Sequence, residues 1–210
     1  KRFLFRKSDY TEIDASRLRH KEINDLIKYC VNEGLTKIVI KNVFGQRYIG
    51  TRLYAPKKVD IEIYGFPGND LGAFLNGHRI VVHGNAQDGV GNTMDNGEIV
   101  VHGRAGDVVA MSMRGGSIYI KEDVGYRTAI HMKEYTEKIP VLVVGGTAQD
   151  FFGEYMAGGR VILLGLNLGH KPHRARYIGT GMHGGIMDIC GRVEKHQLGK
   201  EVGEVEIEKE

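Results

Sequence analysis

Residues 65–121 repeat one pattern three times, as GFPGNDLGAFLNGHRIVVH (65–83), GNAQDGVGNTMDNGEIVVH (84–102) and GRAGDVVAMSMRGGSIYIK (103–121). Each copy is nineteen residues long, opens with glycine and closes with a short apolar run led by isoleucine. A fixed period of about twenty residues is typical of repeat proteins, in which each copy packs against the next.

The composition of each copy indicates one short strand per turn of a solenoid. Glycine and asparagine fill the first part of the copy, where tight turns need positive φ, and β-branched residues follow. One strand cannot bury its apolar face alone, whereas strands stacked about 4.8 Å apart have a partner above and below. We therefore expect an all-β fold, a single-stranded right-handed parallel β-helix. The leucine-rich repeat is the nearest alternative, but its L-x-x-L-x-L frame is missing.

The same register extends to both sides of the central copies. The sequence RYIGT occurs at residues 47–51 and again at 176–180, and residues 146–164 form another regular copy. The pattern predicts about seven turns of about nineteen residues each. Small residues at the seventh position of each copy would stack into one structural column, consisting of Gly50, Gly72, Gly91, Ala110, Gly153 and Gly179.

The repeats divide the chain into three parts. Residues 43–193 are predicted to form the β-helix, and residues 1–42 an N-terminal segment with a capping helix. Residues 194–210 are predicted to be a C-terminal tail, in which glutamates alternate with apolar residues as far as Ile207. This pattern predicts either one exposed strand or a disordered segment.

An amphipathic helix is expected in the N-terminal segment. Asp14 or Ser16 can cap it, and the apolar residues that follow keep the i, i+3, i+4, i+7 spacing of one buried face as far as Glu33. Gly34 supplies a C-terminal stop. Because the end turn of a solenoid needs its core covered, we interpret this helix as a cap, with a partner-docking helix as the alternative.

The composition argues against several classes of function. The net charge is only +3, and no basic run with interleaved aromatic residues suggests nucleic-acid binding. Cys30 and Cys190 lack the spacing of a disulfide or metal framework, which favours a reducing compartment. The charged N-terminus shows no signal peptide, and the longest apolar run, VILLGL (161–166), is too short to span a bilayer. We expect a cytoplasmic protein that binds neither nucleic acid nor membrane.

Motifs that look like catalytic or ligand sites have simpler explanations in the repeat. The sequence GTGMHG (179–184) matches G-x-G-x-x-G but precedes a strand pattern, which argues against a nucleotide site. Two histidine pairs lack a third ligand, so no metal site is expected. One aspartate per turn suits a hydrogen bond to the backbone better than a catalytic strip. The residues concerned are His83 with His102, His170 with His173, and Asp70, Asp88, Asp107 and Asp150.

Two insertions between regular turns are the candidate partner contacts, because solenoids carry binding residues on such insertions. The first lies around Tyr135, and the second contains His170 and His173. No residue of the chain is assigned a catalytic or metal-binding role.

The frame Gly-x-x-Gly-x-x-x-Gly is complete at Gly65, Gly68 and Gly72, and it recurs with one substitution in each of the next two copies. Together with RYIGT after the helix, this frame resembles the GXGXG domain at the C-terminus of the large subunit of glutamate synthase, over residues from about 14 to 193. It is most similar to the archaeal arrangement, in which that domain is a separate polypeptide.

The resemblance implies a structural role. Glutamate synthase makes two glutamates from glutamine and 2-oxoglutarate, using a glutaminase part with an N-terminal cysteine and a part that carries FMN and an iron–sulfur cluster. The β-helix domain of that family packs against these parts and is not known to supply catalytic residues. This chain opens with Lys1, and two isolated cysteines cannot hold an iron–sulfur cluster. The expected protein is a non-catalytic assembly subunit without a cofactor, bound to glutaminase-type and FMN/iron–sulfur-type chains.

Two alternatives stay open. The β-helical subunit of formylmethanofuran dehydrogenase belongs to a related family that shares the glycine frame, and it is also an assembly piece. A stand-alone β-helix enzyme acting on a polysaccharide belongs to a different class, but the chain lacks tryptophan and a visible signal peptide. Self-association into a homo-oligomer is compatible with each of these functions.

Overall fold

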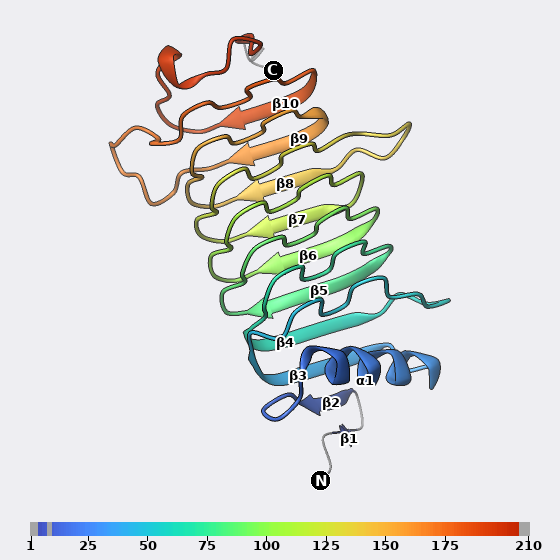
Figure 1. The fold of residues 1–210 in the computed structure, drawn as a ribbon. Helices are drawn as coiled ribbons and strands as arrows, with labels where there is room; N and C mark the ends of the chain where they lie inside the picture. The colour runs from blue at the N-terminus through green and yellow to red at the C-terminus, as the bar shows by residue number, and fades with distance from the viewer. Residues whose placement is uncertain (1–3, 8–9, 206–210) are drawn as a thin grey trace, which may run out of the picture.

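The computed structural model describes residues 4–7 and 10–205 of the chain. Its strands form one ten-stranded sheet whose strands follow each other in chain order, and the sheet rises along an elongated molecule from the N-terminal to the C-terminal end (Figure 1). β1 pairs with β2 antiparallel, and the later pairs are parallel. The elements are β1 (Leu4–Arg6), β2 (Thr11–Asp14), α1 (His20–Asn32), β3 (Lys37–Phe44), β4 (Asp60–Phe66), β5 (His78–His83), β6 (Gly97–Val101), β7 (Ser117–Ile120), β8 (Val141–Val144), β9 (Ala157–Leu163), β10 (Gly184–Ile189) and a 3-10 turn, η1 (Lys195–Gln197).

Each turn of the chain contributes one strand, so the predicted all-β solenoid of about seven turns is confirmed. Alternate strand residues point inward: in β6, Ile99 and Val101 are buried, whereas Val100 between them is partly exposed. Pairing keeps equivalent residues in register from turn to turn, which stacks like side chains in the core. The central inward column consists of Ile61, Ile80, Ile99, Ile118, Leu142, Val161 and Met187.

The rest of each turn contains bends that are held by backbone hydrogen bonds between successive turns. The N–H of Gly91 donates to the carbonyl of Leu71 at 2.9 Å, and the N–H of Ala110 donates to the carbonyl of Val90 at 2.8 Å. These bonds satisfy backbone groups that irregular chain would leave unpaired inside the protein. The turns are therefore bonded to one another on the bend side as well as in the sheet. The equivalent donors are Gly72, Gly91, Ala110, Ala129, Gly153, Gly179 and Gly199.

Helix α1 lies at the N-terminal end of the solenoid, where the sequence predicts a cap (Figure 1). Its buried residues Ile23, Ile27 and Cys30 belong to the same hydrophobic cluster as the inward strand residues. The side-chain amide of Asn24 donates to the carbonyl of Arg47 at 3.2 Å, which ties the helix to the next turn of the chain.

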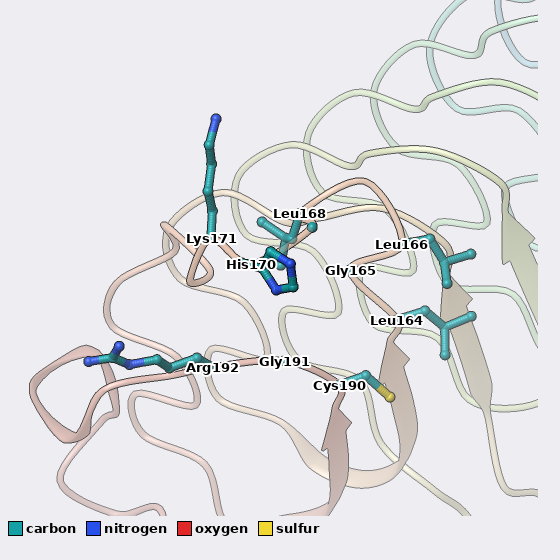
Figure 2. Close-up of a pocket in the computed structure, with 10 residues that line it drawn as sticks. Leu164, Gly165, Leu166, Leu168, His170, Lys171, Cys190, Gly191 and Arg192 are labelled. Carbon is teal, nitrogen blue, oxygen red and sulfur yellow. The ribbon is translucent and has the colours of Figure 1, made fainter.

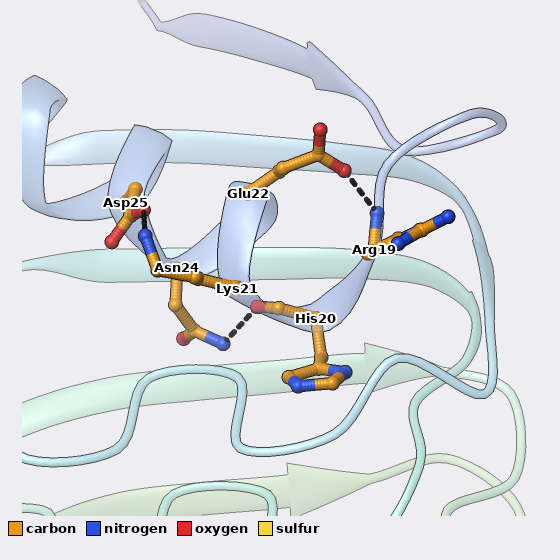
Figure 3. Close-up of polar contacts among 6 residues, drawn as sticks. All are labelled: Arg19, His20, Lys21, Glu22, Asn24 and Asp25. Carbon is orange, nitrogen blue, oxygen red and sulfur yellow. Dashed lines mark hydrogen bonds and ion pairs between the residues drawn. The ribbon is translucent and has the colours of Figure 1, made fainter.

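The predicted start of this helix is wrong by several residues. Asp14 ends strand β2, and its Oδ1 accepts hydrogen bonds from the N–H of Ser16 and the side-chain amide of Asn42, both at 3.0 Å. The helix instead has Arg19 as its N-cap residue, and the N–H of Arg19 donates to Glu22 Oε2 at 2.8 Å (Figure 3). The pairing of β2 with β3 therefore extends the sheet through the residues that local preference assigns to a helix cap.

The repeat pattern continues past residue 193 into the predicted tail. Leu198 forms a parallel bridge with Ile178, and the N–H of Gly199 donates to the carbonyl of Ile178 at 2.7 Å. A Cβ placed on Gly179 would overlap the side chain of Val202. The sequence LGKEV (198–202) thus begins a further turn, whereas Ile207 and Lys1 lie outside the described residues.

We expect Gly91→Val to lower the free energy of unfolding by about 3 kcal/mol or more. The residue has a φ of 67°, which costs a branched side chain about 1–2 kcal/mol, and a Cβ there would overlap Ile118 Cδ1, which adds overpacking of about 1–3 kcal/mol. Urea unfolding followed by circular dichroism measures the change.

Gly77→Val is the matched control, because Gly77 has a φ of 83° but nothing within 4 Å of an added Cβ. The control should show the backbone cost alone. Equal losses in the two variants would show that the interior has room at Gly91.

Candidate functional site

Three residues with positive φ occur at alternate positions in each turn, and they decide which side chains face outward. In one turn, Phe151, Gly153 and Tyr155 have φ values of 64°, 70° and 53°. The middle residue is buried, whereas Tyr155 is 45% exposed. We call the surface made by the outer residues of these triplets the turn face. The middle residues are Gly50, Gly72, Gly91, Ala110, Ala129, Gly153 and Gly179.

The structure brings all six residues of the predicted small-residue column to this middle position and adds Ala129. A Cβ on Gly72 would lie 2.6 Å from Ile99 Cδ1, so glycine is required opposite isoleucine. By continuation of the register, the residues opposite Ala110 and Ala129 are Leu142 and Val161, so neither alanine faces an isoleucine. The insertion that follows Ala129 obscures the place of this residue in the repeat. Its one visible signal is Met132, which follows Ala129 at the usual spacing of three.

The outer residues of the triplets are mostly not glycine. The sequence pattern did not predict that they form one surface. A left-handed conformation costs an L-residue about 1–2 kcal/mol relative to glycine, so side chains here are retained despite the backbone strain. These outer residues are Tyr48, Arg52, Asp70, Phe74, Thr93, Val108, Ser112, Arg127, His131, Phe151, Tyr155 and Tyr177.

The recurring aspartates bond to the backbone of the next turn. Oδ1 of Asp88 accepts from the N–H of Asp107, and Oδ1 of Asp107 accepts from the N–H of Tyr126, both at 2.8 Å. Asp150 accepts from the N–H of the residue one turn above it, also at 2.8 Å. Asp70 stands one position further on, where it accepts from the side chain of a neighbouring asparagine. The carboxylates are thus hydrogen-bond acceptors within the repeat, as the sequence suggests, and not opposed pairs.

The histidine pairs are arranged differently from each other. His83 and His102 stack with ring centroids 5.3 Å apart, and Tyr64 stacks on His83 at 4.4 Å. His173 is buried, and its Nε2 lies 2.8 Å from the carbonyl of Cys190. Within residues 4–7 and 10–205, no three histidine, cysteine, aspartate or glutamate side chains are grouped as a metal site requires.

The two predicted partner contacts lie on different protrusions. Tyr135 is 66% exposed at a small hairpin, where it exchanges two backbone hydrogen bonds of 3.0 Å with Lys138. His170 lies beside a pocket between the second insertion and residues 190–192. Figure 2 shows Lys171 and Arg192 extending away from the hollow, so its basic groups do not converge on a common ligand. His173 lies beneath this insertion and is not available to a partner.

The G-x-G-x-x-G match at 179–184 is part of the repeat. Gly179 is a middle residue of the frame, and Gly181 is an outer residue whose added Cβ would overlap the ring of Tyr155. Gly184 begins β10, so a strand follows the motif. The helix N-terminus that a dinucleotide phosphate requires is not at this position.

Asp123 joins the second insertion, through Asn167, to the turn two levels below it, and it also bonds Thr147 in the turn between them. Burial opposes its ionisation, but hydrogen bonds from the N–H and hydroxyl of Thr147 and from the side chain of Asn167 outweigh it, and the pKa of Asp123 is lowered. A lowered pKa in the folded state means that the ionised carboxylate stabilises the fold.

We therefore expect Asp123→Asn to lower the melting temperature at pH 7, where the wild-type carboxylate is ionised. The difference from wild type should shrink as the pH falls below about 4, the ordinary pKa of aspartate, because the unfolded chain binds the proton before the native carboxylate does. Calorimetry between pH 3 and pH 7 measures both. A difference that stays constant with pH would show that charge has no part in the contact.

Comparison with known proteins gives one family and one relative. The family described as GXGXG motif matches residues 22–209. An uncharacterized protein of Methanocaldococcus jannaschii is 53% identical over 209 aligned residues, which cover 94% of this chain and 79% of the relative. No solved structure matches the chain. In the described part of the chain, no helix has the length and apolar character needed to cross a membrane.

Proposed function

The chain belongs to the GXGXG motif family, and on that premise we propose that it is a non-catalytic assembly subunit of a glutamate synthase. In this reaction, glutamine and 2-oxoglutarate give two glutamates. A glutaminase-type chain would release ammonia, and a chain with FMN and an iron–sulfur cluster would carry out the reduction. This chain would hold the two together and carry no cofactor.

The observation that carries the proposal is the match of the GXGXG frame along nearly the whole chain. The disposition of polar groups supports a structural role, because the recurring aspartates accept hydrogen bonds from the next turn. Cys30 is buried, and burial raises the pKa of its thiol, which disfavours the reactive thiolate. The free thiols of Cys30 and Cys190 suit a reducing compartment, and we propose the cytoplasm as its location.

Reconstitution from purified chains tests the proposal. The glutaminase-type and FMN/iron–sulfur-type chains from the same organism would be mixed with and without this chain, and glutamate formation would be followed. A scaffold couples two sites without taking part in either reaction. Omitting this chain should therefore lower glutamine-dependent synthesis at least tenfold and leave synthesis from free ammonia unchanged.

Failure of this chain to form a complex with either protein would overturn the proposal. Association instead with a molybdenum- or tungsten-pterin chain would assign it to a formylmethanofuran dehydrogenase-like complex. Glutamate synthesis that is equally fast without this chain would exclude a coupling role even if the three proteins associate.

The first insertion gives a more local prediction. Tyr135→Ala should weaken association with the partner chains several-fold and leave the melting temperature unchanged, because the side chain is 66% exposed. Isothermal titration calorimetry measures the affinity. Tyr54→Ala is the matched control, since Tyr54 is 81% exposed in a loop of the first turn. If the two variants bind alike, the hairpin is not a contact.

A further inference from the structure

The turn face of the C-terminal half carries two stacks of ring side chains. Phe151 and Tyr177 stack with centroids 4.9 Å apart, and the guanidinium of Arg127 lies over the other side of Phe151 at 4.3 Å. His131 and Tyr155 stack at 5.3 Å. The first stack uses the first outer position of each triplet, and the second stack uses the other outer position. We call these five residues the aromatic plateau.

We propose that the aromatic plateau is a docking surface for a protein partner with a carboxylate-rich face. This inference rests on the proposed function, in which a partner chain binds the solenoid, and it names the surface and the chemistry of that contact. Aromatic residues and arginine supply most of the binding energy in protein interfaces.

Backbone geometry is the first argument. All five plateau residues have positive φ, from 53° to 64°, where the repeat accepts glycine without strain. Their side chains lie outside the core, and Tyr177 and Tyr155 are 52% and 45% exposed. Large side chains retained in a strained conformation are not required by the backbone, and the stacking of rings across successive turns distinguishes the plateau from the other exposed rings of the turn face.

The charge around the plateau is the second argument. Arg127 pairs with Glu154 at 3.2 Å, and Arg176 pairs with Asp150 at 3.5 Å. In both pairs the acid is the more buried member: the side chains of Glu154 and Asp150 are 10% and 20% exposed, against 43% and 63% for the arginines. The surface therefore presents guanidinium groups outward, which complements carboxylates on a partner.

The ring orientation favours a protein over a glycan. Sugars stack on open ring faces, but both faces of Phe151 are covered, one by Arg127 and one by Tyr177. Tyr155 is covered by His131 on one face, and its other face lies against Gly181, where an added Cβ would overlap the ring. Phe151 and Tyr155 thus offer ring edges, which together with the tyrosine hydroxyls and cations suit carbonyl and carboxylate oxygens.

The test compares the wild-type protein with the double variant Tyr155→Gly, Tyr177→Gly. The probes are the purified glutaminase-type and FMN/iron–sulfur-type chains, with binding measured by calorimetry. Glycine removes the rings and relieves the strained backbone, so the melting temperature should stay within about 3 °C of wild type. The Kd for one of the two chains should rise at least tenfold. Arg176→Glu should weaken the same contact and reduce its dependence on salt.

The matched control is Tyr48→Gly, Phe74→Gly, which makes the same change at left-handed, exposed positions near the other end of the turn face. It should bind as wild type does. If the plateau variant binds normally while the wild type binds, this inference fails and the proposed function stands. If the wild type binds neither chain, both fail.

Two further outcomes would also overturn the inference. A fall in melting temperature of more than about 10 °C in the plateau variant would show that the stacks serve stability. Binding of an acidic oligosaccharide that the plateau variant loses would replace the protein partner with a glycan.

Discussion

The structure depends on one repeated hydrogen bond, from the N–H of a small residue to a carbonyl one turn below. The bond from Gly91 to Leu71 has equivalents from Gly72 to Gly199. From Gly50 to Gly179 the residue at this position is left-handed and faces the core, and at Gly50, Gly72 and Gly91 an isoleucine from the sheet leaves no space for a Cβ. The left-handed backbone and the limited space together account for a glycine or alanine in the middle of the frame and for the outward direction of the two flanking side chains.

Because the strained positions come in pairs around each glycine, the same frame builds the interior and the exposed surface. The interior is nearly invariant in kind, since aliphatic residues and methionines recur turn after turn. The turn face varies from end to end, with Thr93 and Ser112 in the middle and stacked rings in the later turns. The side chains that distinguish one turn from another therefore lie mainly on the turn face. A change in the side chains of one turn can leave the packing of the other turns intact.

Periodicity was sufficient to predict the solenoid and its number of turns. It failed where tertiary pairing overrides local preference: Asp14 looks like a helix cap, but its segment pairs with β3. Ala129 and LGKEV (198–202) were missed because one precedes an insertion and the other lacks a β-branched run. The ring stacks could not be predicted from the sequence. Insertions of unequal length separate Arg127, Phe151 and Tyr177, so only the folded structure shows that they are aligned in successive turns. The insertions themselves could be located from the sequence, but whether their side chains converge on a ligand depends on contacts that spacing does not encode.

Because each turn bonds to the next in the same way, the length of the molecule changes in steps of one turn. Adjacent strands are about 4.8 Å apart. The number of turns therefore sets the distance between helix α1 at one end and the aromatic plateau toward the other end. Residues 84–102 form a complete unit whose edges match those of its neighbours. Gain or loss of such a unit during evolution would change the spacing between the surfaces at the two ends in discrete steps and leave the chemistry of each surface intact. The length of this solenoid can therefore be selected independently of what it binds.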